Sequence, residues 1–154
     1  SPASVRPDKP ITDLDEAAMA YKSHHVLYAY AAFLFLGGLT GFASGGFASK
    51  AKSSVIVGTV SAALALGCAV LADVGAGAPP KKGESGYKKW MIGVHLGLML
   101  PLLLGPIFAW RAVKASAVPE KAYLAKILGA LCAGSALCFG ALIVLKPKKT
   151  KNAP

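Results

Sequence analysis

Charged residues, and acidic residues in particular, are scarce in this sequence. Asp, Glu, Lys and Arg make up 16% of the 154 residues, whereas an average soluble domain has about 25%. Only 7 residues are acidic against 17 basic ones, the net charge is +10, and 55% of the chain is hydrophobic. This balance argues against a water-soluble domain. The basic charge is expected to serve lipid headgroups and topology rather than nucleic acid, because no aromatic and basic platform for bases is present.

The sequence also lacks the motifs of common enzymes and metal sites. Its three cysteines, Cys68, Cys132 and Cys138, lie in apolar runs and form no CxxC or other metal-ligand spacing. The Gly-rich GGLTGFASGG ends an apolar run instead of joining a strand to a helix, so it is not expected to bind a nucleotide. Paired carboxylates and a Ser/His/Asp signature are missing from the apolar runs. We therefore expect a protein that is not an enzyme.

Long apolar runs are what the sequence does contain. About 20 apolar residues suffice for a helix to cross a bilayer. We predict an all-α, four-helix transmembrane protein with both termini on the same face and spans at about 26–47, 55–74, 90–110 and 122–145. Residues 1–25 are expected to form a polar arm and a short N-terminal interfacial helix, Asp13–Lys22, with Thr12 as its N-cap. Residues 146–154 form a basic tail.

Lysine and arginine are unevenly divided between the two predicted faces. The face with the termini and the 75–89 loop carries 11 of them, and the other face carries 6. Six of the seven acids also lie on the termini face, so the net charge is +5 on each. The positive-inside rule counts Lys and Arg, and it places the termini in the cytoplasm, stroma or matrix. The small, polar, Pro-rich start is typical of a processed organellar N-terminus.

Small residues and prolines distinguish the predicted spans. Gly37, Gly41 and Gly45 repeat every four residues in the first span, and similar pairs occur in the second and fourth. Such stripes let another helix approach closely. Pro101 and Pro106 lie inside the third span. They predict either a broken helix that lines a transport site or a helix bent around a neighbour or pigment.

Candidate cofactor-binding residues gather near the termini face. They are His95, His24, His25, Glu84 and Asp73. His95 lies deepest, since it is five residues inside Trp90 in the third span. A histidine within a span suggests a role. It could bond to a free carbonyl or a hydroxyl, act as the axial ligand to a chlorophyll magnesium, or share a haem with a second histidine. Haem is not expected, because His24 and His25 look shallower and CxxCH is missing.

The third span resembles a known photosynthetic helix. HLGLMLPLLLGPI, residues His95–Ile107, is similar to the last helix of the photosystem I subunit O family, which has a His-Leu-Gly-Leu start and a glycine about ten residues on. That family has two spans, whereas four are expected here. The resemblance implies pigment contact at His95.

A second resemblance is wider. The segments Tyr30–Gly46 and Gly105–Leu131, with the span around Gly58, are similar to the small four-helix family of plastid fatty-acid exporters and a mitochondrial porphyrin-pathway protein. That family has a Gly-Gly pair ending the first helix and a basic turn before the last one. The chain departs from it in extra turn residues and in the long loop Gly75–Lys89.

These features lead to three expectations about function. The first is a non-catalytic accessory subunit of an algal photosystem I supercomplex in the plastid thylakoid membrane, with both termini in the stroma. It would bridge core and antenna, contact other membrane subunits and lipids, and bind chlorophyll and carotenoid. The second is a small lipid or porphyrin transporter. The third is an accessory subunit of a mitochondrial respiratory complex.

Overall fold

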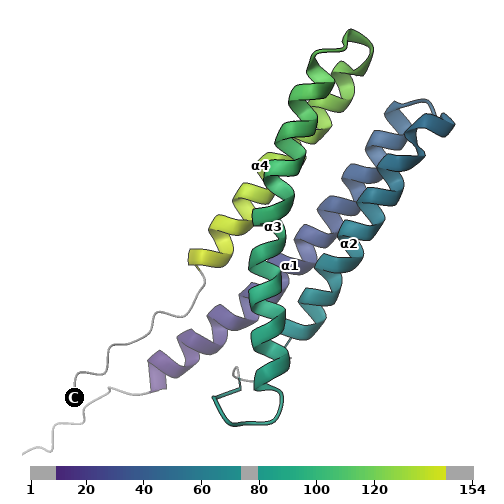
Figure 1. The fold of residues 1–154 in the computed structure, drawn as a ribbon. Helices are drawn as coiled ribbons and strands as arrows, with labels where there is room; N and C mark the ends of the chain where they lie inside the picture. The colour runs from purple at the N-terminus through teal and green to yellow at the C-terminus, as the bar shows by residue number, and fades with distance from the viewer. Residues whose placement is uncertain (1–9, 74–79, 145–154) are drawn as a thin grey trace, which may run out of the picture.

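Four long helices make up most of the chain. The computed structural model describes residues 10–73 and 80–144, and all regular structure in those ranges is helical. The helices are α1 Pro10–Ser44, α2 Lys52–Ala72, α3 Tyr87–Ser116 and α4 Ala122–Val144 (Figure 1). Two short 3-10 helices, η1 Ser49–Ala51 and η2 Pro119–Lys121, precede α2 and α4. The all-α prediction is therefore confirmed for the described residues, and four helices are long and apolar enough to cross a membrane.

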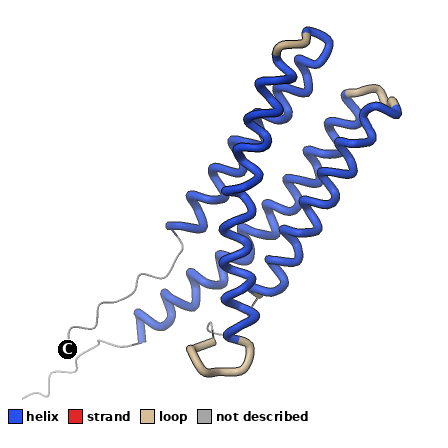
Figure 2. Tube along the Cα trace, in the orientation of Figure 1, coloured by secondary structure: helices blue, strands red, loops and turns tan. Residues whose placement is uncertain are grey.

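The helices form two hairpins. α1 packs along α2 and α3 packs along α4, while α2 contacts α3 and α1 contacts α4 to join the hairpins. Figure 2 shows the two hairpins close together at one end and spread apart at the other. α1 begins and α4 ends toward the end that carries the α2–α3 connection (Figure 1). The tight turns of both hairpins therefore share the opposite end, which we call the turn end.

The first helix is longer than the sequence suggested. α1 runs without interruption from Pro10 to Ser44, so Thr12 lies within the helix and is not its N-cap. No glycine or proline occurs between Pro10 and Gly37, and nothing there separates a short helix from the first span. The helix ends at Ser44, and just beyond it Gly46 and Phe47 have left-handed φ angles of 68° and 57°. The predicted basic tail, 146–154, and residues 1–9 of the predicted arm lie outside the described residues, whereas Pro10 and Ile11 already belong to α1.

Glycines set the closest helix contacts. A Cβ on Gly58 of α2 would lie 2.7 Å from the Cα of Gly38 in α1, so these two backbones touch. Gly93 of α3 faces the backbone of α2 in the same way, because a Cβ added there would lie 2.5 Å from the backbone nitrogen of Ala72. Gly37 accepts the side chain of Leu131 from α4. The predicted small-residue packing is thus present in α1 and α2, and α3 also takes part.

Pro101 and Pro106 bend α3 without ending it. The helix continues through both residues. Each proline removes a backbone donor, which frees the carbonyls of Gly97 and Leu102. Figure 1 shows α3 bending near its middle, so that its second half follows α4 away from α1 and α2. Beyond this bend the two hairpins diverge toward the turn end (Figure 1).

Large apolar side chains cover the outside of the bundle. Exposed fractions reach 60% for Leu36, 62% for Ile56 and 75% for Leu137. The core holds smaller or well-buried groups, among them Leu27, Leu34, Ala65 and Ala69. Soluble monomers rarely expose apolar surface on this scale. The arrangement is compatible with a transmembrane protein.

Candidate functional site

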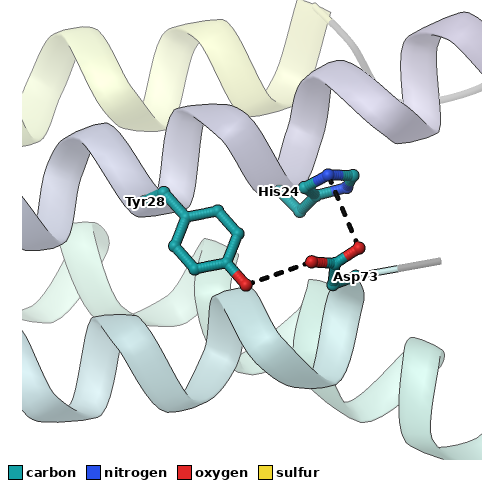
Figure 3. A network of polar contacts seen from close by, with 3 residues as sticks. All are labelled: His24, Tyr28 and Asp73. Carbon is teal, nitrogen blue, oxygen red and sulfur yellow. Dashed lines mark hydrogen bonds and ion pairs between the residues drawn. The ribbon is translucent and has the colours of Figure 1, made fainter. Parts of the chain in front are cut away.

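A polar cluster joins the start of the apolar part of α1 to the end of α2. His24 is buried, and its Nε2 lies 3.6 Å from Oδ1 of Asp73. One turn later, the Tyr28 hydroxyl donates a hydrogen bond of 3.1 Å to Oδ2 of the same carboxylate. Figure 3 shows both side chains directed from α1 toward Asp73. The structure thus brings together two predicted site residues, His24 and Asp73, and it adds Tyr28, which was not among the predicted site residues.

The other two predicted residues near this end, His25 and Glu84, are not part of the contacts to the Asp73 carboxylate described above. His25 is exposed, and its ring meets that of His24 edge to face with centroids 4.7 Å apart. Glu84 accepts a hydrogen bond of 2.9 Å from the backbone N–H of Lys81, and its own N–H donates to the Lys81 carbonyl. Its carboxylate therefore serves the turn before α3. Within the ranges that the structure describes, no group of three His, Cys, Asp or Glu side chains could hold a metal ion.

His95 stands on the outer surface of α3. Its side chain is exposed, and Nδ1 lies 2.7 Å from the carbonyl oxygen of Met91, one turn earlier. A carbonyl oxygen can only accept a hydrogen bond, so Nδ1 carries the proton in this contact. In the neutral ring, Nε2 then keeps the lone pair. The bond fixes both the tautomer and the direction of the ring, as is usual for a histidine that ligates a metal.

An apolar groove begins at Pro101, nearly two turns beyond His95 on α3. Leu102 follows His95 by seven residues, so the two positions are only about 20° apart around the helix. Leu102 and Pro106 line a groove of about 360 Å³ between α3 and α4, whose other wall includes Cys132 and Phe139. His95 therefore lies on about the same side of α3 as this groove, about 10 Å from Leu102 along the helix axis. A flat apolar ligand held at Nε2 could extend over the groove.

A larger cavity lies between the two hairpins at the turn end. It measures about 470 Å³ and is lined by residues of all four helices. Three of the lining residues are basic, namely Arg111, Lys114 and Lys121. In the sequence analysis these three residues were counted only among the basic residues of one predicted membrane face. The spacing of Arg111 and Lys114, three residues apart on a helix, was the signal that they share a side.

Buried polar side chains also connect α1 to α4. The Tyr30 hydroxyl and Ser135 Oγ are 2.7 Å apart, and both side chains are buried. Ser135 donates its single hydrogen to the carbonyl of Leu131 at 2.8 Å. Tyr30 must then donate to Ser135. This bond ties the middle of the bundle together beneath the cavity.

The cysteines behave as small core residues. Cys68 and Cys138 are buried, Cys132 is half-buried, and all three are free thiols. Their predicted position within apolar helices is confirmed.

Comparisons with protein-family models, with curated proteins and with solved structures give no match for this chain. What it does is therefore inferred from its own residues.

Proposed function

We propose that this chain is a transmembrane, non-catalytic accessory subunit that holds a chlorophyll through His95. The observation that carries the proposal is the bond between His95 Nδ1 and the Met91 carbonyl. It leaves Nε2 directed away from that carbonyl on an exposed side chain. A chlorophyll magnesium needs one axial ligand, and neutral imidazole is a common metal ligand in proteins.

The surroundings of His95 fit a chlorin better than a bare metal ion. The nearby groove is apolar and open, as a macrocycle and its hydrocarbon tail require. When bound, chlorophyll would supply light absorption, and the chain would supply an axial nitrogen and an apolar wall. His24 is directed to Asp73 instead (Figure 3). That pairing favours a structural role for His24 and weighs against a haem shared with His95.

The outer surface supports work within an assembly. Some of the small residues expected to pack against other helices contact none within this chain. A Cβ added at Gly67, Gly129 or Gly140 would meet nothing within 4 Å. Their stripes therefore face outward, where helices of neighbouring subunits could approach. With the resemblance of span three to a photosystem I subunit, this favours a photosynthetic supercomplex of the thylakoid membrane. The chain would bridge core and antenna there, with carotenoid as a second pigment and its termini in the stroma.

The test is a pigment count on the complex isolated from native membranes. The wild-type chain is expected to co-purify with chlorophyll, seen as a red absorption band. A His95→Leu variant should stay in the complex and lose about one chlorophyll per chain, because leucine suits an apolar surface and cannot ligate magnesium. A His25→Leu variant is the matched control and should keep every pigment. A chlorophyll-free wild-type complex, or an unchanged count in His95→Leu, would refute the proposal.

Transport of a lipid or porphyrin is the second candidate, and the cavity at the turn end favours it. Leu34 and Leu131, which are nearly completely buried, line this cavity. Further from the turn end, Leu27 fills the space over Gly97. A path through one chain would have to open this packed region, so transport is the less favoured function. Flux of a labelled fatty acid into proteoliposomes would establish transport, and zero flux would count against it.

A further inference from the structure

The cavity at the turn end has a charged rim and an apolar interior. Its rim carries the basic residues Arg111 and Lys114 near the end of α3 and Lys121 in η2. Its interior is lined by hydrophobic side chains of α1, α3 and α4: Leu34, Leu104, Ile107, Phe108, Leu128 and Leu131. The volume of about 470 Å³ is within the range of about 300–1,000 Å³ that is typical of ligand sites.

The rim is uniformly positive. Among the lining residues none is acidic, and the other polar groups are the hydroxyls of Ser53 and Ser54 and the indole N–H of Trp110. Lys114 lies over the Trp110 ring, with Nζ 4.0 Å from its centroid. This contact holds the ammonium beside the mouth of the cavity. Arg111 and Lys121 line the same cavity, so its mouth suits a phosphate or sulfonate, which arginine can bind with two parallel hydrogen bonds.

Charge and apolar surface are separated along the bundle axis. Leu104 precedes Arg111 by seven residues on α3, which corresponds to about 10 Å at 1.5 Å per residue. The deepest wall, Leu34 and Leu131, is nearly inaccessible to solvent. A ligand that satisfies both regions has an anionic head and a hydrocarbon chain. Basic pockets between membrane helices bind the head groups of anionic lipids on the cytoplasmic or matrix side, and this cavity offers the same chemistry at the turn end.

We infer that the cavity binds an anionic membrane lipid. Its headgroup phosphate or sulfonate lies among Arg111, Lys114 and Lys121, and one acyl chain reaches Leu104 and Leu131 between the hairpins. α3 bends near its middle, and the part of the helix beyond the bend lines this cavity (Figure 1). The inference is independent of the pigment proposed at His95, because the two sites share no residue. The lipid site binds an anionic group through basic side chains, whereas the pigment site uses a neutral imidazole and an apolar groove.

Trp110 lines the cavity and reports its occupancy. In a Trp90→Phe background Trp110 is the only remaining tryptophan of the chain. The purified full-length chain is placed in nanodiscs that contain brominated phosphatidylglycerol or, at the same mole fraction, brominated phosphatidylcholine. Bromine quenches indole fluorescence at contact. The anionic lipid should quench Trp110 at several-fold lower mole fraction than the zwitterionic one.

Charge-matched variants separate the cavity from general surface charge. Arg111→Gln with Lys121→Gln removes two of the three rim charges and should abolish the several-fold preference for the anionic lipid, because the attraction to anionic lipid falls with each basic residue that is lost. Lys52→Gln with Lys126→Gln removes the same charge from exposed residues near the turn end that do not line the cavity. That control should keep the preference. Helicity measured by circular dichroism checks that each variant is folded.

Three outcomes would overturn the inference. The first is equal quenching by the two lipids in the wild-type chain. The second is the same loss of preference in both double variants, which would reduce the effect to surface charge. The third is release of the brominated phosphatidylglycerol by free glycerol phosphate at equal concentration, because a headgroup alone cannot replace a lipid whose chain is held between the hairpins.

Discussion

At the scale of single residues, glycines decide how closely the helices approach. Gly58→Ala would place a methyl group 2.7 Å from the Cα of Gly38, where only a backbone shift can make room. Overpacked sites typically lower the unfolding free energy by about 1–3 kcal/mol, and we expect a loss near the upper end of that range. Gly67→Ala, on the same helix with open space within 4 Å of the new methyl group, is the control and should be neutral or slightly stabilising. Unfolding in mixed micelles measures both, and equal stability would contradict the close contact.

A second test at this scale concerns the buried bond between Tyr30 and Ser135. Removing it by Tyr30→Phe or Ser135→Ala leaves the rest of the contact surface nearly unchanged. Side-chain hydrogen bonds between membrane helices contribute about 0.6 kcal/mol on average and up to about 1.7 kcal/mol. The two single variants and the double variant form a cycle, and we expect a coupling energy within that range. Additive effects of the two substitutions would show that the hydroxyls do not interact.

At the scale of helices, the bend of α3 controls the separation of the hairpins. Replacing both Pro101 and Pro106 by alanine restores two backbone donors and should straighten α3. The turn end of the α3–α4 hairpin should then move toward that of α1–α2. Spin labels at Ser49 and Ala117, both exposed at the turn end, would report a shorter distance than in the wild-type chain. Pro119→Ala, which lies outside α3, should leave the distance unchanged, and an unchanged distance in the double variant would contradict this role of the prolines.

The sequence predicts the helices better than their partners. Apolar runs of about 20 residues are sufficient to locate four helices, because backbone hydrogen bonds within a membrane can only be satisfied internally. They do not locate the start of α1, because the helix begins at Pro10, well before the first apolar run of the sequence. They also do not show that Gly38 meets Gly58, or that Asp73 faces His24 and Tyr28. These contacts depend on rotation of each helix about its axis, which length and composition do not determine.

The site was predicted only in part for the same reason. His95 is set apart in the sequence as the deepest histidine of an apolar run, and its position on α3 agrees with that. The bond to Met91 required a side-chain rotamer, which the sequence does not specify. Predicting the cavity would have required the relative placement of the two hairpins and the bend of α3, neither of which the sequence specifies. Its basic residues come from different elements, and no local spacing joins Lys121 to Arg111.

At the scale of the whole molecule, the central claim is a chain that crosses a membrane four times. Its helices have apolar outer surfaces, and its charged residues lie mainly at the two ends. Such a chain places both hairpin turns on one side of the bilayer and the α2–α3 connection on the other. The richer lysine and arginine content on the side of the connection and the termini makes that side the cytoplasmic, stromal or matrix side of the proposal.

Labelling of single cysteines in sealed vesicles tests this claim most directly. Cys68, Cys132 and Cys138 are first replaced by alanine, and one cysteine is then introduced at Ser49, Ala117 or Ser85, all of which are exposed. A membrane-impermeant maleimide should label Ser49→Cys and Ala117→Cys from the same side, and Ser85→Cys only from the opposite side. Labelling of all three from one side, or of Ser49→Cys and Ala117→Cys from different sides, would contradict a four-span protein.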